Sequence, residues 1–327
     1  MKVINIKEIS GVNIGNAQNF EAGTGCTVIL CQDGACAGLD VRGGGPASRE
    51  SQLLQPLAAA DQIHAVLLSG GSAFGLDAAG GVQKYLEERG IGVDVGVTKV
   101  PLVCQSCLFD LTVADASVRP DAAMGYEACI EAQKENYQDG NFGAGTAATV
   151  GKFYGMDFCM KSGIGSYAIQ TGDLQIGAVV AVNAWGDIYD WKNGQKISGL
   201  LSKDKKSFRS TQEEILKSYQ VVDNKFVGNT TIGAIITNGD FHKNQLNKIA
   251  SMAQDGMARV ICPVHTSVDG DSIYALSAGK VKADQDVVGT LAAQVFSEAI
   301  LCAVKSAKGA YGYPSVNDVK KNWRNER

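Results

Sequence analysis

The stretch GNTTIGAIITNGD, residues 228–240, contains the clearest buried strand of the chain, and it begins in an unusual way. An apolar run from Ile232 to Ile236 ends at the turn-forming residues Asn238-Gly239-Asp240, which is the pattern of a strand inside a protein. A Gly-Asn-Thr-Thr step precedes the run, although a buried strand has no need of it. We therefore ask which fold contains this strand and which chemistry its first residues serve.

The chain of 327 residues has the composition of an ordinary globular protein. Apolar residues make up 45% and charged residues 20%, which is enough for a large core. The length alone suggests two domains, although single α/β domains of this size occur. The net charge of −4 and the lack of a long basic run argue against binding to nucleic acid. We expect partners that are small molecules or further copies of the chain.

The N-terminal segment MKVINIKEISGVNIGN alternates apolar and polar residues and lacks the apolar core of a signal peptide. No apolar run approaches the length needed to span a bilayer, so we expect a cytoplasmic protein with no membrane partner. Nine cysteines in such a chain favour thiols over disulfides. One CxxC pair, Cys104 and Cys107, and three histidines, His64, His242 and His265, do not make a convincing zinc site.

Short apolar or alternating runs bounded by Gly, Asp or Asn predict strands at residues 26–31, 37–41, 65–69 and 176–182. Helical periodicity covers residues 73–89, 243–261 and 286–307, with Asp240 as the candidate cap of the second helix. Strands and helices do not alternate strictly, and 39 glycines imply many tight turns. The pattern therefore favours an α/β (α+β) protein of layered sheets with helices outside over a doubly wound parallel sheet.

The segment from residue 192 to residue 229 differs from the rest of the chain. It is rich in Lys, Arg and Glu, including Lys196, and it has few strongly apolar residues. This composition predicts an exposed, partly helical linker. The linker ends directly before the strand that begins at the Gly-Asn-Thr-Thr step.

Two glycine-rich stretches resemble known signatures but lack the residues that those signatures require. GAGTAATVGKF, residues 143–153, has Thr146 and Phe153 where a phosphate-binding loop needs Gly and then Ser or Thr. SGGSAFGLD, residues 69–77, has Phe74 where a nucleophile elbow needs Gly. The amides around Gly71 and Ser72 either bind a carboxylate at a helix N-terminus or simply begin the helix. Gly71 and Ser72 are therefore also candidates for the substrate pocket.

The bond between Asn229 and Thr230 joins the linker to the strand, and its cleavage would change the chemistry of Thr230. A threonine hydroxyl is a poor nucleophile at neutral pH unless a base takes its proton. A terminal amine, with an unperturbed pKa of about 7.7 to 8.0, is such a base, and cleavage would place it on the same residue. Thr230 would attack the carbonyl that precedes it, release Asn229 and then act as catalyst. The pattern by itself is also that of an ordinary turn.

Seven ordered blocks make the chain similar to the DmpA-type family of self-cleaving hydrolases. That family includes L-aminopeptidase/D-esterases, β-aminopeptidases and nylon-oligomer (6-aminohexanoate) endo-hydrolases. The resemblance covers nearly the whole chain. The blocks are GCTVILC, AGLDVRGGGPASRE, HAVLLSGGSAFGLDAAGGVQKYLEERGIG, NFGAGTAATVGK, GAVVAVNAWGD, GNTTIGAIITN and MARVICPVHTSVDGDSIYALSAG.

The resemblance implies roles for the residues that match the family's motifs. Because the family cleaves itself before the Ser or Thr that opens the strand, it implies cleavage between Asn229 and Thr230 and makes Thr230 the nucleophile. The family's lysine matches Lys152, which would lower the pKa of a nearby amine. The family's asparagine matches Asn183 in VNAWGD, and one amide donor to a developing oxyanion is typically worth about 3 to 4 kcal/mol.

The resemblance also assigns two carboxylates in the motif Asp269-Gly270-Asp271. Aminopeptidase members have Ser at the first of these positions, so Asp269 makes the chain more similar to the nylon-oligomer hydrolases. Residues two apart in an extended segment face the same way, and both carboxylates are therefore expected to point at the amine and hydroxyl of Thr230. There they would orient the ammonium and shuttle a proton. Without the resemblance, the motif is an ordinary hairpin turn.

Three features depart from the family pattern. Phe109 stands before Asp110 where some members have tyrosine, and because phenylalanine donates no hydrogen bond, a backbone amide or Asn183 must serve the oxyanion. Ala147 replaces a glycine that is usual in the family. Cys104 and Cys107 replace aliphatic residues or proline, close to the expected pocket that also includes Phe109. We therefore expect their thiols to contribute to the pocket wall.

Taken together, we expect a layered αββα sandwich of the DmpA and ornithine acetyltransferase type, made as one domain and processed into residues 1–229 and 230–327. The resemblance implies an amide hydrolase acting through an acyl-enzyme on Thr230, without metal or organic cofactor. Its substrate is a small peptide or amide, and it forms a homo-oligomer, a tetramer of αβ units or larger. The alternatives are an acyltransferase of the ornithine acetyltransferase type and an unprocessed, non-catalytic homologue.

Overall fold

Strand β15 (Thr230–Gly239) lies in the interior of the protein in the computed structural model, which describes residues 1–217 and 228–325. Ile232, Ala234 and Ile236 face the space between two sheets, whereas Ile235 faces a layer of helices. Both faces of the strand are therefore buried, which explains its nearly continuous apolar sequence. The predicted strand is confirmed, and it begins at Thr230, two residues before the apolar run.

Strand β15 belongs to a ten-stranded sheet in which most neighbouring strands are antiparallel. Only the pairs β15–β17 and β5–β8 along its path are parallel. In spatial order the strands are β1 (Lys2–Ile4), β11 (Ile164–Thr171), β12 (Leu174–Asn183), β15, β17 (Ser272–Val281), β3 (Thr24–Val41), β5 (Ile63–Ser69), β8 (Val103–Cys107) and β4 (Ala47–Arg49), with β2 (Asn13–Asn19) also paired to β3.

The long strand β3 joins the two halves of this sheet. Its first part pairs with β2 and β5, and its last part, from Cys36 to Val41, pairs with β17. The register against β5 shifts between Leu30 and Ala35, where Gly34 has a φ of 82°. The sequence predicted two separate strands here, at 26–31 and 37–41. The structure has one strand instead, because an irregularity of this kind bends the chain without ending its pairing.

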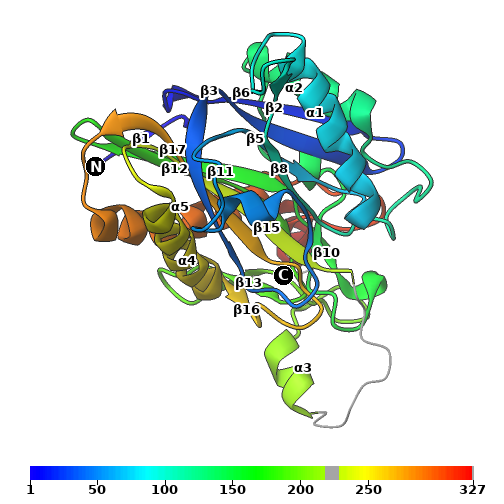
Figure 1. Ribbon diagram of the computed structural model, residues 1–327. Coiled ribbons are helices and arrows are strands. Elements are labelled where there is room, and N and C mark those ends of the chain that lie inside the picture. Colours follow the sequence, from blue (N-terminus) through cyan, green and yellow to red (C-terminus); the bar gives the residue numbers. More distant parts are fainter. Residues whose placement is uncertain (218–227, 326–327) are drawn as a thin grey trace.

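Helices cover the outer faces of both halves of the sheet (Figure 1). On one side α4 (Lys243–Val260) and α5 (Gln285–Ser306) pack against β11, β12 and β17, and on the other α1 (Ala78–Glu87) and α2 (Ala122–Gln133) pack against β2, β3 and β5. Apolar side chains fill three spaces, one under each helical pair and one between the sheet halves. The expected αββα sandwich is confirmed.

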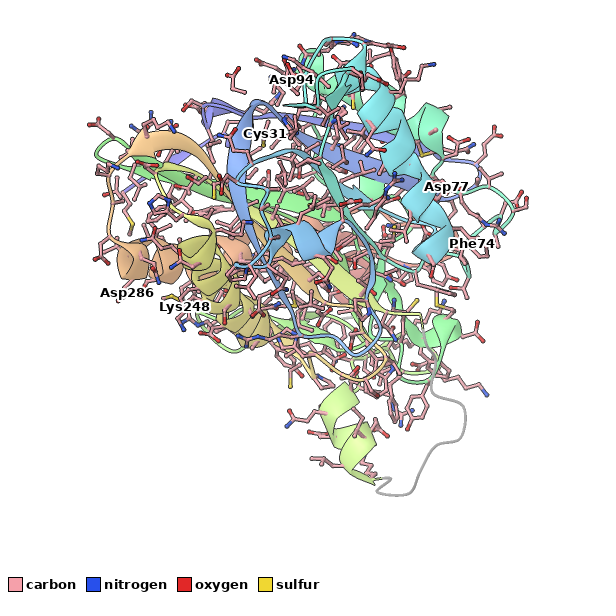
Figure 2. All side chains as sticks on the ribbon, in the orientation of Figure 1. Cys31, Phe74, Asp77, Asp94, Lys248 and Asp286 are labelled. Carbon is pink, nitrogen blue, oxygen red and sulfur yellow. The ribbon has the colours of Figure 1, made fainter. Side chains whose placement is uncertain are left out.

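Charged residues and one phenylalanine are exposed at the outer surfaces of the two helical layers. Figure 2 shows Lys248 on α4 and Asp286 at the start of α5 on one side of the molecule, and Phe74 and Asp77 next to α1 on the other. All four residues are exposed, whereas Cys31, on β3, is buried.

Two helix boundaries differ from the prediction. The stretch 73–89 begins as a 3-10 helix, η3 (Ser72–Asp77), because Gly71 and Ser72 have φ angles of 83° and 53° and cannot start a regular α-helix. The N-cap of α4 is His242 and not Asp240, which instead pairs with Lys282. The predicted helices at 243–261 and 286–307 are otherwise confirmed to within one residue.

Helix α5 is the one helix in the described part of the chain that is long and apolar enough to cross a membrane. The sequence had indicated no such segment. Most of its apolar stretch is buried, and it packs against α4, β11 and β12. Here α5 is a core helix.

The linker contains more ordered structure than expected. Helix α3 (Thr211–Lys217) is the predicted helical part, and it stands apart from the four layers in Figure 1. Lys196, however, is half-buried and pairs with the carboxylate of Asp187 at 2.7 Å, and Leu200 and Leu201 are core residues. The remainder of the predicted linker, residues 218–227, lies outside the described residues.

Shorter elements complete the described chain. The small sheets pair β9 (Thr149–Val150) with β10 (Met160–Lys161), β13 (Asp187–Tyr189) with both β14 (Lys196–Ser198) and β16 (Ile261–Cys262), and β6 (Val93–Asp94) with β7 (Lys99–Val100). The remaining helices are η1 (Ile6–Glu8), η2 (Ser51–Leu54), η4 (Gly143–Gly145), η5 (Met156–Phe158) and α6 (Val316–Asn325).

The close packing of α5 on β11 predicts a strong effect of one methyl group. A Cβ on Gly165 would lie 2.2 Å from the nitrogen of Ala303, a main-chain atom that cannot easily move. We expect Gly165→Ala to lower the free energy of unfolding by about 1–3 kcal/mol or more. Gly80→Ala in α1 meets no atom within 4 Å, and we expect it to raise that free energy by about 0.5–1 kcal/mol. Urea titration of both variants measures the contrast, and equal effects would contradict it.

Candidate active site

Four strand ends meet at one edge of the large sheet and bring distant residues together. The antiparallel pairing of β12 with β15 places Asn183 directly opposite Thr230. The parallel pairing of β15 with β17 sets Ile232 opposite Ser272, so Asp271 lies just before β17 at the same edge. The last residue of β3, Val41, also pairs with Ser272. The edge therefore gathers the start of β15 and β17 and the end of β12 and β3.

The hydroxyl of Thr230 lies against the carbonyl group that it is expected to attack. Its Oγ1 contacts the carbonyl oxygen of Asn229 and accepts a hydrogen bond of 3.1 Å from the main-chain N–H of Gly270. Such a donor stabilises a hydroxyl oxygen as it loses its proton. The exposed fractions of Asn229 and Thr230 are 2% and 3%, so the bond between them is enclosed by protein.

Lys152 is buried beside this bond, with an exposed fraction of 1%. Its Nζ donates to the side-chain oxygen of Asn183 at 2.8 Å, to the carbonyl of Asn183 at 3.1 Å and to the carbonyl of Gly228 at 2.8 Å. Burial lowers the pKa of the Lys152 ammonium to about 7, against the opposing charges of Cys159, Asp269 and Asp110. Lys152 can therefore exchange a proton near neutral pH. It does so beside the carbonyl of Gly228, the residue that precedes Asn229.

The side chain of Asn183 is oriented by the donors around it. Its oxygen accepts from the main-chain N–H of Thr149 at 3.0 Å and from Lys152, so its NH2 group must point the other way. That group donates to the carbonyl of Phe109 at 2.8 Å and lies 3.4 Å from the carbonyl of Gly228. In the intact chain the amide is directed at main-chain oxygens next to the bond.

Asp271 holds the loop before β17 to the start of β15. Its Oδ1 accepts a hydrogen bond of 2.8 Å from the main-chain N–H of Thr231. Its Oδ2 accepts from the main-chain N–H of His265 at 3.2 Å and lies 2.9 Å from the ring Nδ1 of the same residue. Sequence reasoning gave His265 no role, since a histidine six residues before Asp271 has no recognisable spacing.

Asp269 turns to a different set of partners. Its carboxylate accepts from the hydroxyl and the main-chain N–H of Thr266, and from the main-chain N–H of Trp185 at 3.4 Å. Burial, followed by the charge of Asp271, raises the pKa of Asp269 to about 6. Asp269 can therefore carry a proton near neutral pH.

Both carboxylates were expected to point at the hydroxyl and amine of Thr230, and the intact chain has a different arrangement. Asp271 binds the next amide along the strand, that of Thr231, and the loop reaches the hydroxyl of Thr230 through the N–H of Gly270. In the intact chain the nitrogen of Thr230 is part of a peptide bond and carries no positive charge. The attraction that would draw a carboxylate towards it is therefore absent in the intact chain.

The glycine loop after β3, residues 43–45, packs against the Asp269-Gly270-Asp271 segment. The N–H of Gly45 donates to the carbonyl of Asp269 at 2.8 Å, and the N–H of Arg42 donates to that of Asp271 at 3.0 Å. A Cβ on Gly43 would lie 2.3 Å from the nitrogen of Asp271. The run of glycines therefore lets one main chain lie directly on another, and sequence reasoning gave it no role.

Gly43→Ala tests this close approach. We expect it to displace the Asp271 loop and to slow any reaction at Thr230 at least tenfold, because the added Cβ overlaps main-chain atoms. Gly45→Ala is the matched control, since the nearest atom to its Cβ is 3.7 Å away. Cleavage between residues 229 and 230 is followed by mass spectrometry. Equal rates in the two variants would show that the contact has no functional effect.

The turn around Gly71 and Ser72 binds a carboxylate, but one that belongs to the protein. The N–H of Gly71 donates to Asp110 at 2.7 Å, and the hydroxyl of Thr24 donates to the other oxygen of Asp110 at 2.7 Å. The N–H of Ser72 donates to the carbonyl of Leu108 at 2.9 Å, and its side chain is half-buried. The turn thus anchors the segment whose next carbonyl, that of Phe109, accepts from the amide of Asn183.

Asp110 is buried, and burial raises the pKa of its carboxyl group to about 6 although the hydrogen bonds from Thr24 and Gly71 oppose the shift. Below the unfolded pKa of about 4, both states are protonated. As the pH rises towards 6, the unfolded chain loses its proton first, so the free energy of unfolding falls by roughly 3 kcal/mol. We expect Asp110→Asn to reduce this fall, as measured by urea titration from pH 4 to pH 7.

The exposed Asp77→Asn in the same turn region is the control for Asp110→Asn, and it should leave the pH dependence unchanged. Each variant is compared with the parent chain in the same state of processing. An unaltered slope in Asp110→Asn would mean that the Asp110 carboxyl group titrates as it does in water.

Other buried groups surround the site. Lys161, which sequence reasoning missed, is fully buried and donates to the carbonyls of Gly145 and Ala148 at 3.2 and 3.1 Å. Burial lowers the pKa of its ammonium to about 7.

Cys104 and Cys107 lie in the core on β8, so neither thiol is a free group on a pocket wall. Burial also raises the pKa of the Cys104 thiol to about 12. Within residues 1–217 and 228–325, no three His, Cys, Asp or Glu side chains converge as a metal site would require.

Comparison with known proteins defines the class of the protein first. The L-aminopeptidase D-Ala-esterase/amidase of Ochrobactrum anthropi, described as a variant of the Ntn hydrolase fold, superposes with a TM-score of 0.71 over 98% of this chain and 93% of that chain, at 16% identity. The chain therefore has this variant of the Ntn hydrolase fold. The model of peptidase family S58 matches residues 5–316, and the chain belongs to this family.

Two curated relatives match over almost their whole length. An uncharacterized aminopeptidase of Mycobacterium leprae is 35% identical, over 95% of this chain and 92% of the relative. A 6-aminohexanoate-oligomer endohydrolase of Kocuria is 30% identical, over 91% of this chain and 85% of the relative. The resemblance to this group of hydrolases is confirmed, and the protein is a hydrolase of the peptidase S58 family.

Proposed function

We propose that the chain is a self-processing amide hydrolase whose nucleophile is Thr230, and that it matures into residues 1–229 and 230–327. One observation carries the proposal. The Thr230 hydroxyl contacts the carbonyl of its own preceding residue, accepts from the Gly270 N–H, and lies at the strand start opposite Asn183. An exposed turn would need none of this enclosure. Membership of peptidase family S58 supports hydrolysis of an amide over acyl transfer to a second amine.

In self-processing, the Thr230 oxygen attacks the carbonyl carbon of Asn229, and the bond from that carbon to the Thr230 nitrogen breaks. The hydroxyl proton passes to the nitrogen, which becomes a free amine, and Asn229 is held as an ester. Water then attacks the ester, releasing the Asn229 carboxylate and restoring the hydroxyl. Lys152 and the side-chain amide of Asn183 both donate to the carbonyl of Gly228, the residue before Asn229. This position supports a role for them in stabilising the negative charge that develops on the carbonyl oxygen of Asn229.

In the mature enzyme the same hydroxyl attacks the substrate amide. The Thr230 amine takes the hydroxyl proton, an acyl-enzyme forms, and the leaving amine takes the proton as it departs. Water resolves the acyl-enzyme to a carboxylate. Asp269, with a pKa of about 6, and Lys152, with a pKa of about 7, are two groups of the site whose protonation can change near neutral pH, and we propose that they assist this proton transfer.

For the substrate we propose a small peptide or an ω-amino amide. The Asp269-Gly270-Asp271 motif and the Kocuria 6-aminohexanoate-oligomer endohydrolase support the second class, whereas the mycobacterial relative is named an aminopeptidase. A panel of aminoacyl, β-aminoacyl and 6-aminohexanoyl amides distinguishes these classes. We further propose that the enzyme acts in the cytoplasm. It is proposed to form a homo-oligomer of αβ units, a tetramer or larger, and light scattering tests this oligomeric state.

Intact-mass spectrometry during incubation of the purified chain tests the central proposal. We expect two fragments that divide between residues 229 and 230, and amidase activity that rises in step with them, because the enclosed hydroxyl has no free amine before cleavage. Thr230→Ala should abolish both cleavage and activity, a loss of at least a thousandfold, whereas Thr230→Ser should retain both.

Thr231→Ala is the matched control, since Thr231 is the buried neighbour whose hydroxyl makes no hydrogen bond within the described residues. Amidase activity of the uncleaved Thr230→Ala variant would place the nucleophile elsewhere. A parent chain that stays intact and hydrolyses no amide in the panel would overturn the proposed function.

A further inference from the structure

His265 makes two contacts with Asp271 and lies outside the residue set described for the reaction. Its main-chain N–H donates to Asp271 Oδ2 at 3.2 Å, and its ring Nδ1 lies 2.9 Å from the same oxygen. The opposite oxygen, Oδ1, accepts from Thr231 at 2.8 Å. The carboxylate is thus held between His265 and the strand that begins at Thr230.

The backbone of His265 adopts a conformation that histidine rarely occupies. Its φ is +56°, in the left-handed region that glycine and asparagine reach with less strain. The next residues, Thr266 to Asp269, form the turn that holds Asp269, with the hydroxyl of Thr266 donating to the Asp269 carboxylate. A glycine here would satisfy the backbone but would remove the ring, so the backbone alone does not account for histidine.

The ring itself is enclosed and oriented. Only 16% of the His265 side chain is exposed, and within the described residues its Nε2 is buried without a hydrogen-bond partner. With the Asp271 carboxylate as acceptor, Nδ1 is the donor of this bond, and within residues 1–217 and 228–325 it is the one polar contact of the ring. A buried polar ring with a single partner is suited to holding that partner.

We propose that His265 is a positioning residue, which acts through its Nδ1–H bond to hold the Asp271 carboxylate on the amide of Thr231 and so fixes the place of the Thr230 hydroxyl. The inference rests on the proposed function, because it assigns a role in the reaction of Thr230. His265 does not touch the reacting atoms. Its effect reaches them through Asp271 and the Gly270 N–H, which donates to Thr230 Oγ1 at 3.1 Å.

The arrangement also separates the tasks of the two carboxylates. Asp271 receives N–H donors on both oxygens and serves as an anchor, whereas Asp269 is bound to Thr266 and Trp185. Burial and the charge of Asp271 raise the pKa of Asp269 to about 6. The loss of the His265 donor would loosen the anchor while leaving Asp269 and its own partners in place.

Three substitutions of His265 separate the donor from the backbone. His265→Asn tolerates the left-handed conformation and keeps an N–H donor, His265→Asp has the same shape without the donor, and His265→Gly relieves the backbone and removes the side chain. His242→Asn is the matched control, because His242 is exposed and lies at the N-cap of α4. All four are made in the full chain, and folding is checked by circular dichroism and thermal unfolding.

Three quantities are measured: the rate of cleavage before Thr230, by intact mass, and kcat and KM of the cleaved enzyme on 6-aminohexanoyl p-nitroanilide. We expect His265→Gly and His265→Asp to lower the cleavage rate and kcat at least tenfold with KM within twofold of the parent. His265→Asn should lie within threefold of the parent in every value, and His242→Asn should match it. If His265→Gly does not fold, the comparison of Asn with Asp still decides.

The inference fails if His265→Gly cleaves itself and turns over substrate at the parental rate, or if His265→Asn is as slow as His265→Asp. A parallel rise in KM with no change in kcat would also overturn it, since that pattern indicates lost substrate binding. Failure of the proposed function gives a different result. In that case the parent chain does not divide before Thr230, whatever residue stands at position 265.

Discussion

A buried lysine is stable only if its amine donates hydrogen bonds to acceptors inside the protein, because an unpaired buried polar group costs free energy. Lys152 meets this condition, and its hydrogen bonds join the segments of the candidate active site. Its three acceptors come from the end of β12, through Asn183, and from Gly228 at the entry to β15. The same oxygen of Asn183 that binds Lys152 also accepts from Thr149, which turns the amide towards Phe109 and Gly228. One buried side chain therefore ties three segments together around the Asn229–Thr230 bond.

The strands around this bond are held by contacts between main chains. The glycine loop after β3 lies on the loop before β17, and Asp271 joins that loop to β15. The turn at Gly71 holds Asp110 and with it the segment that presents the Phe109 carbonyl. Rigid strands anchored in three apolar clusters thus position a small number of polar groups, as preorganised sites require. This enclosure surrounds the contact between the Thr230 hydroxyl and its own preceding carbonyl.

Sequence reasoning reached some of these residues and missed others for identifiable reasons. Thr230 could be found because it combines a turn with a strand, while Lys152 and Asn183 were reached only through resemblance to a family. The glycine loop was missed because its partners are main-chain atoms of a segment distant in the sequence, and such contacts leave no periodic signal. His265 and Lys161 were missed because the spacing from each of them to its partners, Asp271 for the first and the carbonyls of Gly145 and Ala148 for the second, matches no known motif. The two predicted strands at 26–31 and 37–41 are one bent strand in the structure. The sequence does not show this, because the second part of β3 is held in the sheet by its pairing with β17, which is distant in the sequence.

The sequence by itself determined the layered class of fold, the helices near residues 243–261 and 286–307, and a buried strand that begins at a Thr. These follow from local periodicity, because a buried face imposes its spacing on the residues that form it. Only the tertiary structure decided that Asn183 lies opposite Thr230, that Asp271 binds Thr231, and that the carboxylate at the Gly71 turn is that of Asp110. Strand order and register set these contacts, and they depend on the joint packing of all four layers.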